Sequence, residues 1–96
     1  MHAVTRTYSG KGAKELFDVL EQNKHEIERL IRSIRGFVSF YLARTAEGGF
    51  SVSVFEDKAG TEESVRIARE WIGRNAGHVG ASPPVVLEGS TILEVK

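Results

Sequence analysis

The segment from Phe37 to Thr45 limits what this chain can fold into, because it is apolar on both faces if it forms a β-strand. Alternate residues of a strand point to opposite sides of its sheet. One row consists of Phe37, Ser39, Tyr41 and Ala43, and the other of Val38, Phe40, Leu42 and Arg44. A solvated sheet face is normally polar. Both faces of this strand therefore need a cover.

The residues on either side of this strand predict further elements. Ala3–Ser9 is predicted to be a strand, since it is partly β-branched and aromatic and leads into glycines. Apolar residues recur every three or four positions from 13 to 34, which predicts one long helix over Ala13–Ile34 that Gly36 ends. Glu47-Gly48-Gly49 predicts a hairpin turn, because glycine adopts the positive φ that tight hairpins require. Phe50–Phe55 is the strand that follows.

The C-terminal half predicts one more helix and one more strand. The helix begins at Gly60-Thr61, with Thr61 as its N-cap, and ends near Asn75. An extended loop with two prolines follows. Val85–Leu87 and Thr91–Val95 together predict a final strand that is interrupted at Gly89.

The resulting order, β-α-β-β-α-β, is that of the ferredoxin-like split βαβ arrangement. We therefore expect an α+β chain folded as one domain over residues 1–96, with a four-stranded antiparallel sheet and two helices on one face. Two helices leave the second sheet face open. A contiguous exposed apolar face usually marks an interface, so we expect a homodimer that forms through the sheet face.

Composition excludes several classes of function. The 13 basic and 13 acidic residues give a net charge of zero, which argues against nucleic acid or an anionic membrane surface as a partner. Cysteine is absent, so disulfides and cysteine-based metal or catalytic sites are excluded. The sequence has neither a signal-like N-terminus nor an apolar run long enough to span a bilayer, and a cytoplasmic location is expected.

Three segments together resemble a known superfamily. They are Arg35-Gly36-Phe37-Val38-Ser39-Phe40-Tyr41 after a helix, the Gly48-Gly49 hairpin, and Val54-Phe55-Glu56-Asp57 leading into a helix. The chain resembles the dimeric α/β-barrel superfamily, and within it the antibiotic biosynthesis monooxygenase-like group, from Val4 to Val95. The resemblance implies a dimer and a pocket between helices and sheet in each subunit. Members include cofactor-independent oxygenases of quinols, haem-degrading oxygenases, isomerases and proteins without an assigned activity.

Three residues are candidates for the wall of such a pocket. Asn23 interrupts the apolar stripe of the long predicted helix and would place a polar group beside the pocket. Trp71 is either a core residue whose indole N–H reaches one acceptor or a pocket wall that stacks on a flat substrate. Tyr41 is either a packing or dimer contact or a hydrogen-bond donor to a substrate oxygen.

Two histidines are candidates for a proton acceptor. A histidine has a pKa near neutrality and could take the proton of a phenol or enol. His25 lies off the apolar stripe of its helix, and His78 follows Gly77 in a loop, so surface exposure is the alternative interpretation for both. No spacing typical of a metal site is present, and no cofactor is expected.

Two functions stay open at this level. The first is a small-molecule-binding or non-enzymatic module that takes an apolar or aromatic ligand. The alternative is a cofactor-independent monooxygenase of a quinol or polyketide-like aromatic. Haem degradation is disfavoured. Trp71 and His78 stand in suitable order for that branch, but residues 1–9 contain no Asn and His78 lies beyond the predicted helix.

Overall fold

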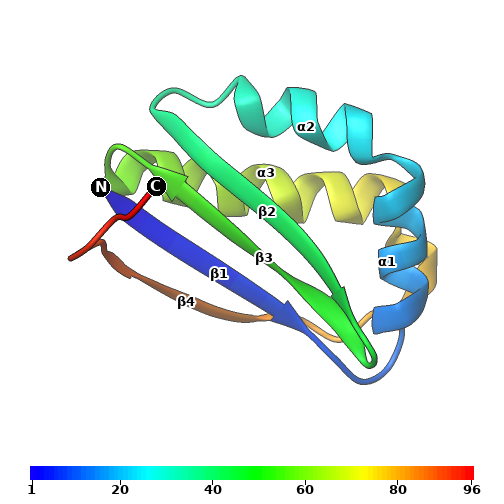
Figure 1. Ribbon diagram of the computed structural model, residues 1–96. Coiled ribbons are helices and arrows are strands. Elements are labelled where there is room, and N and C mark those ends of the chain that lie inside the picture. The colour runs from blue at the N-terminus through cyan, green and yellow to red at the C-terminus, as the bar shows by residue number, and fades with distance from the viewer.

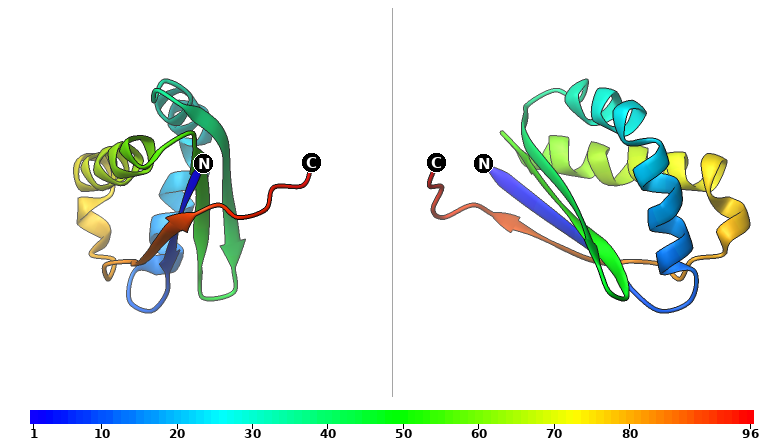
Figure 2. Two further views of the ribbon diagram at one scale, coloured as in Figure 1. Left: turned by 90° about the vertical axis from the view of Figure 1, so that its left-hand side faces the viewer. Right: turned by 45° about the vertical axis from the view of Figure 1, so that its right-hand side comes forward.

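A computed structural model describes residues 1–96 as one antiparallel sheet with every α-helix on the same face (Figures 1 and 2). The strand order is β2-β3-β1-β4. The elements are β1 (His2–Tyr8), α1 (Ala13–Gln22), α2 (Lys24–Arg32), β2 (Phe37–Thr45), β3 (Gly48–Phe55), α3 (Lys58–Asn75), a 3-10 turn (Gly77–Val79) and β4 (Val85–Ser90). The α+β, ferredoxin-like fold predicted from the sequence is confirmed.

The prediction of a single helix over Ala13–Ile34 is wrong, because the chain breaks at Asn23. Its backbone leaves the helical region (φ −117°, ψ 22°), and its N–H bonds to the carbonyl of Leu20. The side-chain amide donates to the carbonyl of Val19 at 2.8 Å. A short polar side chain that bonds to nearby backbone competes with helix continuation. The break sets α1 and α2 at an angle, so that they cover different parts of the sheet (Figure 1).

The hairpin between β2 and β3 turns at Ala46-Glu47, so of the predicted turn Glu47-Gly48-Gly49 only Glu47 lies in it. Thr45 pairs with Gly48, so both glycines belong to β3. Their role is close packing. A Cβ on Gly49 would lie 2.2 Å from the ring of Phe17, and one on Gly48 would lie 2.4 Å from the carbonyl oxygen of Tyr8.

A bulge near the start of β2 changes which residues share a face. Phe37 pairs with Phe55 and Ser39 with Val54, which leaves Val38 as an extra residue. An extra residue reverses the alternation of a strand at that point. Phe37 therefore lies on the helix side with Phe40, where both pack against a core of Ile31, Ile34 and Phe55. The sequence-based grouping of Phe37 with Tyr41 is corrected.

Strand β3 turns its serines inward. Ser51 and Ser53 are buried beneath the helices, whereas Phe50, Val52 and Val54 alternate to the opposite face. From polarity alone, the serines would be expected on the face that carries no helix and the apolar residues beneath the helices. The candidate site lies between this covered face and the helices, where Arg6 and Leu42, the neighbours of Ser51 in the sheet, line it.

Helix α3 begins at Lys58, three residues before the predicted N-cap. Asp57 is the N-cap, and its carboxylate accepts a hydrogen bond from the backbone N–H of Gly60 at 3.2 Å. Thr61 lies inside the helix, where its hydroxyl donates to the carbonyl of Lys58 at 2.9 Å and contacts His2 Nδ1 at 3.0 Å.

We expect Asp57→Ala to lower the free energy of unfolding by about 1 kcal/mol, the usual effect of losing an N-cap acceptor. Asp57→Asn keeps an acceptor at the same place and should cost only a few tenths of that amount. Urea denaturation at one fixed protein concentration measures both. Equal losses in the two variants would contradict a capping role.

The C-terminal strand is shorter than predicted. Strand β4 runs through Gly89 and ends at Ser90, and the N–H of Thr91 donates to the carbonyl of Met1 at 2.9 Å. The predicted continuation over Thr91–Val95 is wrong, because residues 92–96 lie outside the sheet. They leave on the side away from α3 (Figure 2), and Ile92 is 97% exposed. No helix of the chain is both long and apolar enough to cross a membrane.

Candidate ligand-binding site

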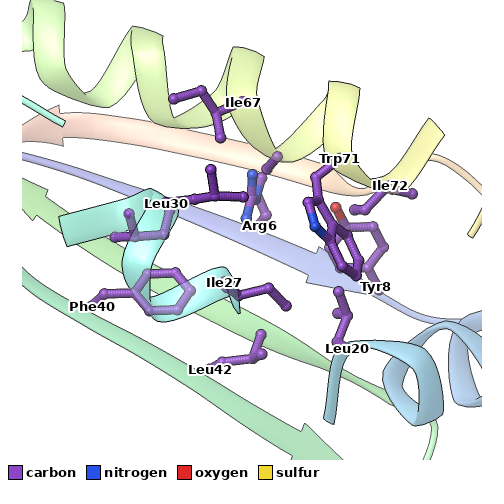
Figure 3. A pocket seen from close by; sticks show the side chains of 12 residues that line it. Arg6, Tyr8, Leu20, Ile27, Leu30, Phe40, Leu42, Ile67, Trp71 and Ile72 are labelled. Atoms are coloured by element: carbon purple, nitrogen blue, oxygen red, sulfur yellow. The ribbon is translucent and has the colours of Figure 1, made fainter. Parts of the chain in front are cut away.

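An apolar cavity lies between the sheet and helices α2 and α3 (Figure 3). Its volume is about 40 Å³, which is room for only a few water molecules. Eleven of the twelve residues around it are hydrophobic, among them Leu20, Leu30, Phe40, Ile67 and Trp71. The twelfth is Arg6. We call this space the inner cavity.

A larger cleft adjoins the inner cavity. It has a volume of about 420 Å³ and lies between β1, β4, α3 and the loop at residues 81–84. Arg6, Tyr8 and Ile72 line both spaces, so these three side chains form the wall between them. The volume falls in the range of sites for small organic ligands. We call this space the outer cleft.

Arg6 lies in the centre of the sheet and points toward the helices. It pairs with Ser51 on β3 and with Val86 on β4. The side chain is 9% exposed, and Nε donates to Ser51 Oγ at 3.4 Å. Burial lowers the pKa of the guanidinium, an effect that Tyr8 partly opposes. An arginine nevertheless stays protonated in proteins, so a positive charge lies beside the inner cavity.

Tyr8 follows Arg6 on the same face of β1. It is 6% exposed and packs edge-on against Phe17, with ring centroids 5.9 Å apart. Burial raises the pKa of its phenol, and the charges of Arg6 and Arg69 oppose that rise. The hydroxyl is therefore protonated at neutral pH and can donate a hydrogen bond to a ligand.

Trp71 forms part of the wall of the inner cavity and joins two helices. It is 7% exposed, and its indole N–H donates to the Glu26 carboxylate on α2. Trp71 is thus a buried tryptophan with one acceptor, which is the first of its two sequence-based interpretations. The side chain also faces the cavity, beside Tyr8 and Ile72 (Figure 3).

The structure does not bring the other predicted site residues to this cavity. Tyr41 lies on the opposite sheet face and is 65% exposed, because it alternates with Phe40 and Leu42. Asn23 is at the junction of α1 and α2, where its amide is bonded to the backbone. His25 on α2 and His78 in the 3-10 turn are both exposed, and neither lines the inner cavity or the outer cleft.

Arg6 and Tyr8 were missed from the sequence. A signal for them was available, since Val4, Arg6 and Tyr8 alternate along one face of a short predicted strand. An arginine between two apolar residues on one strand face indicates a buried cation, provided that this face is the covered one. No cluster of three His, Asp or Glu side chains is placed to hold a metal ion.

Comparison with known proteins gives structural matches only. No family model and no curated protein sequence matches the chain. A protein of unknown function from Nitrosomonas europaea superposes with a TM-score of 0.71 at 18% identity, over 99% of this chain and 91% of that one. A monooxygenase from the gene ActVA-Orf6 of Streptomyces coelicolor, in complex with nanaomycin D, gives 0.64 at 14% identity, over 99% and 89%. The chain shares the ferredoxin-like fold of these proteins.

The haem-degrader MhuD from Mycobacterium tuberculosis, with two haems in its active site, also has this fold. It matches with a TM-score of 0.59 at 21% identity, over 99% of this chain and 98% of that one. The residues of the present site do not fit the haem-ligating pattern. His78 is exposed in the 3-10 turn, and no histidine lines the inner cavity or the outer cleft.

Proposed function

We propose that this protein binds a small, largely apolar molecule between its helices and its sheet. The proposal rests on the apolar inner cavity and on the outer cleft that shares a wall with it. Two proteins of the same fold hold bound ligands, nanaomycin D in one and haem in the other. The inner cavity alone is too small for such a molecule, so a ligand would occupy the outer cleft and enlarge the inner space.

The single tryptophan of the chain provides a direct test, because Trp71 lines the inner cavity. We expect 2-methyl-1,4-naphthoquinone to quench its fluorescence with a saturable dependence on concentration. Ala68→Leu should weaken this binding about tenfold, since Ala68 lines the inner cavity and a larger side chain would fill it. Ala59→Leu, at an exposed position of the same helix, is the matched control. Quenching that rises linearly, as with free tryptophan, would contradict the proposal.

A cofactor-independent monooxygenase is the second candidate. The buried charge of Arg6 favours it, since a nearby cation stabilises the deprotonated form of a phenol. In such a reaction the carbanion of an anthrone-type substrate takes up O₂, a C=O group replaces the CH₂ group, and water leaves. His25 and His78 would have to act from outside the cavity, so their proposed role as proton acceptors receives no support from the geometry. Oxygen uptake with a panel of quinols and anthrones tests this candidate.

We also propose that the protein works as a homodimer through the sheet face that carries no helix, here called the open face. Tyr41, Val52, Thr5 and Leu87 form one row across all four strands of this face. The neighbouring row is Ala43, Phe50, Thr7 and Val85. Large apolar side chains in both rows are exposed in the single chain, including Val85 at 64% and Leu87 at 68%. A cytoplasmic location stays a prediction of the sequence.

A further inference from the structure

Arg6 is a buried cation that forms no ion pair. The side chain is 9% exposed, and its one hydrogen bond runs from Nε to Ser51 Oγ at 3.4 Å. Arginines that do pair with carboxylates lie at the surface, as Arg44 with Asp18 at 2.7 Å and Arg66 with Glu70 at 2.6 Å. Burial removes the water that solvates a guanidinium, which is unfavourable unless another polar group replaces that water. The terminal nitrogens of Arg6 bond to no group within the chain, and neither is fully enclosed, because Thr91 Oγ1 is the only fully buried side-chain polar atom that lacks a partner.

The charged residues that line the two spaces around Arg6 are all positive, and the nearby Glu26 carboxylate is bonded to the indole N–H of Trp71. Arg69, on α3, lines the outer cleft together with Arg6 and Tyr8. The lining of the two spaces includes no Asp or Glu, although the chain has 13 acidic residues. Burial raises the pKa of Tyr8, and the charges of Arg6 and Arg69 both act to lower it. The positive charges of Arg6 and Arg69 therefore both favour a negative charge at the position of the Tyr8 hydroxyl.

The apolar surface on either side of Arg6 determines what kind of anion could bind there. Figure 3 shows the Arg6 side chain between Leu30 on α2 and Ile67 and Trp71 on α3. On its other side the outer cleft adds Pro83, Pro84 and other largely apolar groups. A free inorganic anion would leave this apolar surface uncovered. A ligand with one anionic group on an apolar body would satisfy both parts of the site.

We propose that the ligand is an apolar monoanion, a carboxylate or a phenolate, whose charged oxygen binds the Arg6 guanidinium and the Tyr8 hydroxyl. Arg69 adds long-range attraction at the mouth of the outer cleft, and the apolar body lies against Ile72 and the inner cavity. This inference rests on the proposed function, since it specifies the chemistry of the molecule that the same site binds. A hydrogen bond to a charged group contributes more than a neutral one, so the charge should decide the affinity.

Two probes that differ in charge test the proposal. 2-Naphthoate and 2-naphthylmethanol share one ring system, and only the first is an anion at pH 7. Isothermal titration calorimetry of the full-length native protein should give naphthoate a dissociation constant at least about tenfold below that of the alcohol. Equal affinities would overturn the anion proposal and leave the binding of apolar molecules intact. If neither probe binds, the proposed function itself fails.

Substitutions of three arginines test whether the preference for the anionic probe arises at Arg6. Arg6→Met keeps an unbranched side chain of similar length without charge, and it should weaken naphthoate at least tenfold while changing the alcohol less than threefold. Unchanged alcohol binding also shows that the variant is folded. Arg69→Met should weaken naphthoate by a smaller factor, and Arg66→Met, on the exposed side of the same helix, should have no effect. Naphthoate that binds as well to Arg6→Met as to the native protein would overturn the assignment. If Arg6→Met does not fold, the comparison of the two probes on the native protein decides the matter.

Discussion

A Tyr41→Glu, Leu87→Glu double variant is expected to run as a monomer at concentrations where the native chain is a dimer. Both side chains lie in one row of the open face, and they are 65% and 68% exposed in the single chain. Burial of each large apolar side chain contributes roughly 1.5–3 kcal/mol. A two-fold dimer carries each substitution twice, so four side chains lose this burial, and the dissociation constant of the dimer should rise by roughly ten-thousand-fold or more. The introduced carboxylates add repulsion, because a two-fold axis brings the same patch of both copies together.

Sedimentation equilibrium at micromolar concentration measures this effect. The control is Gln22→Glu, Gly73→Glu, which adds the same charge at exposed positions on the helices. A Cβ at Gly73 would meet no other atom within 4 Å. The control should remain dimeric. If the native protein is itself a monomer at that concentration, the homodimer proposal is wrong. If the Tyr41 and Leu87 variant still dimerises, the interface lies elsewhere.

Phe55→Ala is expected to lower the free energy of unfolding by about 3–5 kcal/mol, a large part of the 5–15 kcal/mol typical of a small domain. Phe55 is fully buried and packs edge-on against Phe37, with ring centroids 6.1 Å apart. Gly60 lies directly against the ring and has no side chain that could fill the resulting hole. The surrounding residues can therefore fill little of the cavity that Phe55→Ala leaves. The loss in free energy of unfolding should lie near the upper end of the range for Phe→Ala substitutions.

Urea denaturation at one fixed protein concentration measures the change, because dimerisation makes apparent stability depend on concentration. Phe55→Leu keeps most of the volume and is expected to cost less than about 1.5 kcal/mol. A loss below 1 kcal/mol for Phe55→Ala would show that Phe55 does not hold β3 to the helices as described.

Much of the fold could be predicted because its signals are local. The run of apolar residues on both faces of the segment and the glycine after the helix were enough to place β2 at Phe37–Thr45, where the structure has it. The errors arose where tertiary packing decides. Gly48 and Gly49 are required by the approach of Tyr8 and Phe17 from other elements, and nothing within the hairpin sequence distinguishes that role from a turn.

The site was harder to predict than the fold, because it depends on which face of each strand is covered. Trp71 could be found from the stripe of its helix. Arg6 could not be assigned without knowing that Ser51, beside it on β3, also faces the helices. The single extra residue at Val38 had a similar effect on β2, since it separates Phe37 from Tyr41. Such an extra residue cannot be recognised from the composition of the segment or from the spacing of its apolar residues.

The hydrogen bond between Trp71 and Glu26 has a consequence for how fast a ligand can bind. It joins α3 to α2 beside the inner cavity, whose volume of about 40 Å³ admits no aromatic ring. A ligand that enlarges this space is expected to move α2 and α3 apart and to break that bond. Association that requires a conformational change is slower than diffusion allows. We therefore expect a weaker bond between Trp71 and Glu26 to speed the arrival and the departure of a ligand alike.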